Sequence, residues 1–175
     1  MPTLRQQLEQ LLKQRVCFVG LGNVEYGDDG FGVGLAEALI DAGMPDVIVA
    51  GTAPDRWIGQ LAAVDHVVFL DAIEFGGAPG DVVFLNSAQM AARFPQISTH
   101  KISLSLLAQW VEANGSTKAW LLGAQPGSLK SPQQLAPTLR ETVDVLCELI
   151  GTSQIGLAAP GGSVNTLEAL TEVTA

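Results

Sequence analysis

Apolar residues fall into short continuous runs that alternate with repeats at helical spacing. The runs predict strands at about residues 15–20, 47–50, 66–70, 81–85 and 118–123. The repeats predict helices over about 3–14, 31–42, 55–63 and 87–93, from 98 or 99 through 112, and after the loop at 124–132 up to about 150. This alternation predicts a three-layer α/β/α sandwich with a five-stranded, mostly parallel twisted sheet.

Local signals add detail to that outline. The short link with Gly76-Gly77-Ala78-Pro79-Gly80 favours a hairpin between the third and fourth strands, and hence one antiparallel strand. Gly32 and Gly34 each weaken their helix by about 1 kcal/mol relative to Ala, so we expect them to allow close packing. We interpret 1–150 as a single α/β domain and 151–175, rich in Gly, Ala, Ser and Thr, as a mobile C-terminal tail.

Composition agrees with such a domain and limits its partners. Hydrophobic residues make up 47% of the 175, and charged residues 15%, as expected for a sheet covered on both faces. The net charge of −9 would repel phosphate backbones and anionic membranes, so we expect neither nucleic acid nor a membrane as a partner. The chain begins without a secretory apolar region, which predicts a cytoplasmic protein. Cys17 and Cys147 lie in apolar runs and are interpreted as small buried hydrophobes.

Three side chains that can bind metal follow or begin elements at one predicted edge of the sheet. Asp29 ends the glycine-rich segment after the first strand, Asp71 ends the third strand, and His100 begins the following helix. Ligands bind at the carboxyl ends of parallel strands, and two carboxylates with an imidazole suit Ni, Zn, Fe or Mn. Structural roles remain open: a helix N-cap for Asp29, for which Asp28 competes, an Asx turn for Asp71 and an exposed first-turn position for His100.

Other site chemistries are disfavoured. Read as G-x-G-x-x-G from Gly20, the glycine-rich segment has Glu25 in place of the third glycine, and Asp28 and Asp29 would repel a phosphate. The sequence contains neither a G-x-S-x-G elbow nor H-E-x-x-H, and neither cysteine is placed near His100. His66, at a strand start without a companion acid, is expected on the rim of the sheet.

Five motifs in this order resemble the hydrogenase maturation proteases. They are Gly20-Leu21-Gly22-Asn23, Gly27-Asp28-Asp29-Gly30 with Gly32, Leu70-Asp71-Ala72, Ser98-Thr99-His100 and Gly123-Ala124-Gln125-Pro126, and the resemblance covers about 16–150. It implies that Asp29, Asp71 and His100 hold the family's three metal-contacting and catalytic positions. The segment 50–54 is similar to the branch that serves formate-hydrogenlyase-type hydrogenases, but has Ala50 where an acid is usual.

The resemblance implies an endopeptidase, aspartic-type by family convention, that removes the C-terminal peptide of a [NiFe]-hydrogenase large-subunit precursor after nickel insertion. The nickel would come with the precursor and serve as the recognition element, and no tightly bound cofactor of the protein's own is expected. Two alternatives remain open. One is a non-catalytic factor that holds a metalloprotein during assembly, and the other is peptidyl-tRNA hydrolase, which the acidic charge disfavours.

Overall fold

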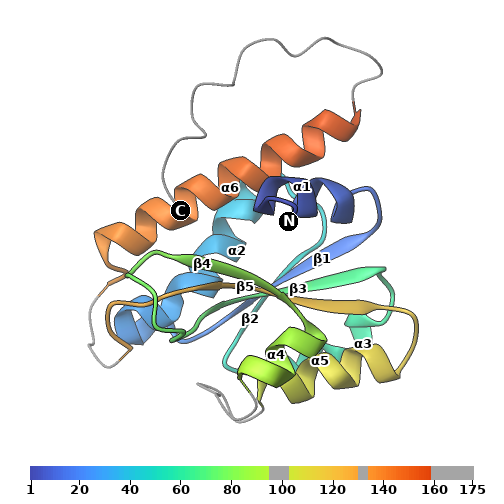
Figure 1. Ribbon diagram of the computed structural model, residues 1–175, viewed down its shortest axis with the longest axis horizontal. Coiled ribbons are helices and arrows are strands. Elements are labelled where there is room, and N and C mark those ends of the chain that lie inside the picture. Colours follow the sequence, from blue (N-terminus) through green and yellow to red (C-terminus); the bar gives the residue numbers. More distant parts are fainter. Residues whose placement is uncertain (95–102, 130–133, 159–175) are drawn as a thin grey trace.

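The computed structural model describes residues 1–94, 103–129 and 134–158, which form three layers around one sheet (Figure 1). The strands are β1 (Val16–Leu21), β2 (Val47–Gly51), β3 (His66–Ala72), β4 (Val82–Asn86) and β5 (Lys118–Ala124). The helices are α1 (Leu4–Leu11), η1 (Val24–Gly30), α2 (Phe31–Asp41), η2 (Pro54–Trp57), α3 (Ile58–Leu61), α4 (Ser87–Arg93), α5 (Leu104–Ala113) and α6 (Pro137–Ala158). The predicted fold class is confirmed.

The strand order of the sheet is β2-β1-β3-β5-β4. Four strands are parallel, and β4 runs antiparallel to β5 at one edge, with Val82 opposite Ala124 and Asn86 opposite Trp120. One antiparallel strand was expected, but its expected hairpin with β3 is wrong. The free side of β3 is taken by β5, so β4 pairs beyond it.

Alternating side chains of the strands fill a separate core on each face. In β1, Val16 and Phe18 face α1, α2 and α6, whereas Cys17 and Val19 face α3, α4 and α5. Strands covered in this way are apolar throughout, as the 47% hydrophobic content led us to expect. Cys17 is buried as predicted, but Cys147 is only partly buried.

Helix α2 lies against the carboxyl ends of β1 and β3 because glycine stands at the contact. A Cβ on Gly32 would clash with the carbonyl oxygens of Leu21 and Leu70, and one on Gly20 would clash with Ala36. Gly34 has only Leu135 Cδ2 near its Cβ position, at 3.9 Å. The close packing expected of both helix glycines is therefore found at Gly32 alone.

Two predicted helices have different boundaries. The helix expected over 55–63 is two short pieces, η2 and α3. Helix α5 begins at Leu104, and Ser103, which accepts the Leu106 N–H at 3.2 Å, is its N-cap. Ser98 or Thr99 as the cap is thus wrong, because the capping Ser lies later in the chain.

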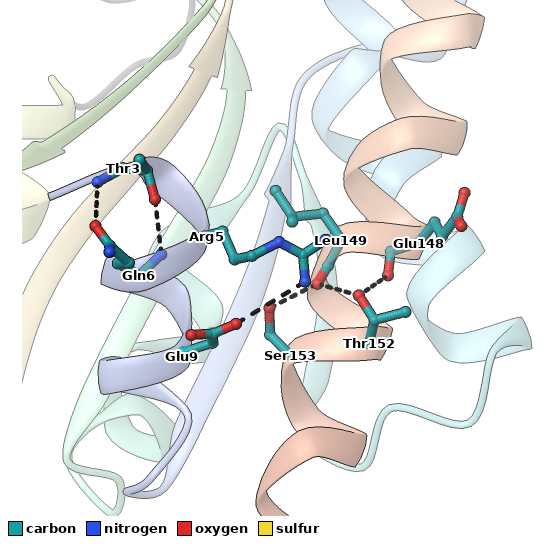
Figure 2. Close-up of polar contacts among 8 residues, drawn as sticks. All are labelled: Thr3, Arg5, Gln6, Glu9, Glu148, Leu149, Thr152 and Ser153. Carbon is teal, nitrogen blue, oxygen red and sulfur yellow. Dashed lines mark hydrogen bonds and ion pairs between the residues drawn. The ribbon is translucent and has the colours of Figure 1, made fainter. Parts of the chain in front are cut away.

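Helix α6 continues past Ile150, where we expected the tail to begin, and ends at Ala158. Its last turns lie beside α1, where Ser153 is buried and its hydroxyl donates to the Leu149 carbonyl at 2.7 Å (Figure 2). The capping box of Thr3 and Gln6 begins α1, whose Leu8 and Leu11 are buried. Packing against α1 explains the longer helix.

No helix in the described part of the chain is long and apolar enough to cross a membrane.

Candidate functional site

Asp29 ends the glycine-rich loop between β1 and α2, with its carboxylate turned inward. The side chain is 7% exposed, and its Oδ2 accepts the backbone N–H of Asn23 at 2.8 Å. Its Oδ1 is buried and accepts no hydrogen bond from any described residue. The N-cap of α2 is Gly30, without a side-chain capping bond, so the structure does not support the N-cap role considered for Asp29. A buried carboxylate oxygen without a donor indicates an atom available to a ligand.

Asp71 lies inside β3, one position before its end. It is 1% exposed, and its backbone pairs with Gly123 of β5. The ladder continues through Ala72, and the Ile73 N–H donates to the Ala124 carbonyl at 2.9 Å, so Asp71 does not close the strand with an Asx turn. Because η1 contacts β3, Asp29 and Asp71 share the carboxyl edge of the sheet, as predicted.

His100 lies outside the described residues, so its predicted place at this edge remains a prediction. Within the described ranges, no group of three His, Cys, Asp or Glu side chains is placed to hold a metal ion. The described part of the site therefore supplies the two carboxylates, with the imidazole still expected from the segment before α5.

Asp28 joins two loops that border the site. Its Oδ2 accepts the N–H groups of Gly127 at 2.8 Å and Ser128 at 3.3 Å, and its Oδ1 accepts that of Ala136 at 2.8 Å. The carboxylate is 4% exposed. The sequence indicated Asp28 only as a competing cap and as a charge that would repel phosphate, because its partners lie about a hundred residues further along the chain.

Gln125 has a similar role beside Asp71. Its side-chain Oε1 accepts three backbone N–H groups, from Phe75 at 2.8 Å, Gly76 at 3.0 Å and Gly77 at 3.2 Å. These bonds hold the loop that follows β3, a few residues after Asp71. The Gly123-Ala124-Gln125-Pro126 motif was the available signal, but it did not reveal which segment the amide would bind.

Gly22 lets the loop fold back over Asp29. Its φ of +118° is in the region that favours glycine, and a Cβ there would clash with the Asp29 carbonyl oxygen. Its N–H donates to the Gly51 carbonyl at 3.0 Å, which joins the ends of β1 and β2. The glycine-rich segment thus serves close backbone packing around a carboxylate.

An open depression of about 410 Å³ lies next to Asp29. Residues 22–25 form one wall, 49–52 at the end of β2 form another, and Val33 of α2 contributes an aliphatic side chain. Among the described residues that line it, Glu25 is the single ionisable one. Ala50, where the family usually has an acid, is among the lining residues, which makes this wall less charged.

His66 lies at the opposite, amino-terminal edge of the parallel strands and takes no part in this site. The Trp120 Nε1–H donates to His66 Nδ1 at 3.1 Å, so Nε2 carries the proton and donates to Gln14 Oε1 at 2.7 Å. Burial lowers the pKa of His66 from its usual 6.5, while the nearby Asp65 charge opposes that effect.

Burial, with a smaller contribution from Asp46, raises the pKa of the Cys17 thiol to about 11, which disfavours a thiolate nucleophile.

Comparison with known proteins shows the family to which this chain belongs. The family model described as HycI, hydrogenase maturation protease, matches residues 33–153. The chain belongs to the hydrogenase maturation protease family. It is 30% identical to the hydrogenase 2 maturation protease of Escherichia coli K12 over 144 residues, which cover 78% of this chain and 88% of that protein.

Solved structures of hydrogenase maturation proteases share the fold. The [NiFe] hydrogenase maturation protease HycI from Thermococcus kodakarensis KOD1 superposes with a TM-score of 0.75 and 32% identity, covering 85% of this chain and 99% of that one. The hydrogenase maturating endopeptidase HybD from E. coli gives 0.66 and 28%, covering 78% and 89%. These findings support the protease reading and give no support to peptidyl-tRNA hydrolase or a non-catalytic assembly factor.

Proposed function

We propose that this hydrogenase maturation protease removes the C-terminal peptide of a [NiFe]-hydrogenase large-subunit precursor after nickel insertion, with Asp29, Asp71 and His100 as the residues that contact the metal. Family membership supports endopeptidase activity on a hydrogenase precursor. The observation that carries the site assignment is the buried Oδ1 of Asp29, which accepts no hydrogen bond within the described residues at the edge that also holds Asp71.

The chemistry of these side chains suits a nickel ion brought by the precursor. Carboxylate oxygens and an imidazole nitrogen are ligands that nickel accepts, and three ligands leave coordination positions for the precursor's own groups. Nickel would supply a recognition element and a Lewis acid near the scissile bond. In this proposal the buried carboxylates of Asp29 and Asp71 would contact the metal, and His100 would add the imidazole.

Such a site would make cleavage selective for a precursor that already holds nickel. A precursor without nickel would lack the group that the two carboxylates and the imidazole bind, so maturation would be checked before cleavage. The protein itself would retain little metal, because three ligands at an open edge lack the closed set of a structural site. We place the reaction in the cytoplasm, with the hydrogenase large-subunit precursor as the partner.

Substitution of each proposed metal-contacting residue tests the site. Because Asp71 is 1% exposed, the isosteric Asp71→Asn is preferable to an alanine that would leave a cavity. We expect Asp71→Asn and His100→Ala to stay folded by circular dichroism, while mass spectrometry shows no trimming of nickel-loaded precursor. Trimming at the parental rate by either variant would overturn its assignment.

A further inference from the structure

We propose that the outer edge of β2, together with the depression beside it, binds an extended segment of the hydrogenase precursor as an added strand. The proposal rests on the proposed function, because it takes the precursor as substrate, and it identifies the surface that holds the chain next to Asp29. Extended peptides commonly bind proteins by adding a strand to an exposed sheet edge.

The edge of β2 has backbone groups directed away from the sheet. β2 is the last strand on its side, and it pairs only with β1 among the described strands. The Phe18 N–H donates to the Asp46 carbonyl at 2.9 Å, so alternation along a parallel strand directs the N–H and C=O groups of Val47 and Val49 outward. Residues 47–51 contain no proline and no charge, the usual protections of an exposed edge.

The adjoining depression suits an apolar side chain of that segment. Val33 and Val49 contribute aliphatic side chains, and the remaining described lining consists of residues 22–25 and 50–52. Two apolar side chains of the neighbouring loop stay exposed, Val24 at 58% and Tyr26 at 48%. Glu25, the one ionisable group in the described lining, disfavours an acidic residue there.

The same surface leads to the candidate catalytic residues. Asn23 lines the depression, and its backbone N–H donates to Asp29 Oδ2 at 2.8 Å. Gly22, the preceding residue, binds the end of β2 through its N–H bond to Gly51. A chain paired with Val47 and Val49 would therefore continue from the depression toward Asp29, as a protease substrate must.

A kinetic experiment with matched variants tests the surface. Val49→Arg places a charge at the edge and in the depression, and Val145→Arg places it at another exposed valine, on α6. With nickel-loaded precursor, we expect Val49→Arg to raise KM about tenfold or more with kcat nearly unchanged, and Val145→Arg to change neither. An unchanged KM for a folded Val49→Arg protein would overturn the docking surface, whereas absence of cleavage by the unaltered protein would overturn the proposed function.

Hydrogen exchange separates strand addition from simple contact. The probe is nickel-loaded precursor made uncleavable by proline after the scissile bond, which the mass of the cleaved product locates. In the saturated complex, we expect the Val47 and Val49 amides to exchange at least about tenfold more slowly, while the amides of β4, the opposite edge strand, exchange as before. Protection of β4 instead, or unchanged exchange at β2, would overturn the proposal.

Discussion

The Asp28 carboxylate accepts three backbone N–H groups from the segment that connects β5 to α6, and so fixes that segment beside the loop that carries Asp29. Its neighbour Asp29 accepts one such bond and keeps Oδ1 without a donor within the described residues. The two adjacent aspartates therefore have different roles, one in holding the loops together and one at the candidate metal-contacting position.

Replacing each of the two by Asn separates these roles. In Asp28→Asn, an amide NH₂ replaces one of the two accepting oxygens and faces a backbone N–H that it cannot accept. We therefore expect the free energy of unfolding, measured by urea denaturation, to fall by about 2 kcal/mol. Asp29→Asn can keep its bond to the Asn23 N–H with the amide oxygen, so we expect little change in stability and loss of precursor processing. Equal stability of the Asp28→Asn and parental proteins would show that the three bonds do not hold the loops together.

His66 predicts a pH dependence of stability. Its folded pKa is lowered below 6.5, so the stabilisation it provides is fully present above pH 6.5 and is lost as the pH falls through the lower folded value. Protonation also removes the Nδ1 acceptor of the Trp120 N–H. We expect the free energy of unfolding to fall between pH 7.5 and 5 by more in the parental protein than in His66→Asn. Identical pH dependence of the two proteins would contradict this role.

At the scale of elements, α2 offers a matched pair of glycines. Gly32→Ala would push α2 away from the ends of β1 and β3, because its Cβ meets the Leu21 and Leu70 carbonyl oxygens, and we expect a loss of about 3 kcal/mol or more. Gly34→Ala has open space, and we expect a gain of about 0.5–1 kcal/mol from helix propensity. Urea denaturation of both variants measures the difference, and destabilisation by Gly34→Ala equal to that by Gly32→Ala would contradict the contact.

The sequence predicted where the helices and strands lie better than it predicted which elements contact one another. Apolar runs located all five strands of the described sheet because each strand contributes apolar side chains to the cores on both faces, and they placed Asp29 and Asp71 at one edge. The partner of β4 was missed because a short link says nothing about β5, which enters later in the chain and occupies the side of β3. The role of Asp28 was missed for the same reason, since Gly127 lies 99 residues away.

At the scale of the whole molecule, one domain presents two buried carboxylates at the carboxyl edge of its sheet. The family match spans 33–153 and thus includes β3 with Asp71, while α1 precedes it and packs on the end of α6. Helix α6 extends into the region that we expected to be a tail, so the segment after Ile150 contributes to the packed structure at least to Ser153. We therefore expect the carboxylates of this domain to recognise a metal that its partner brings.

The most direct test of that claim is mass spectrometry of a hydrogenase large-subunit precursor, with and without nickel, after incubation with the purified protein. We expect the protein to contain less than one metal ion per chain, to trim the nickel-loaded precursor even after it has itself been treated with chelator and desalted, and to leave the nickel-free precursor intact. Cleavage of the nickel-free precursor, or loss of activity when metal is removed from the protease alone, would contradict the account.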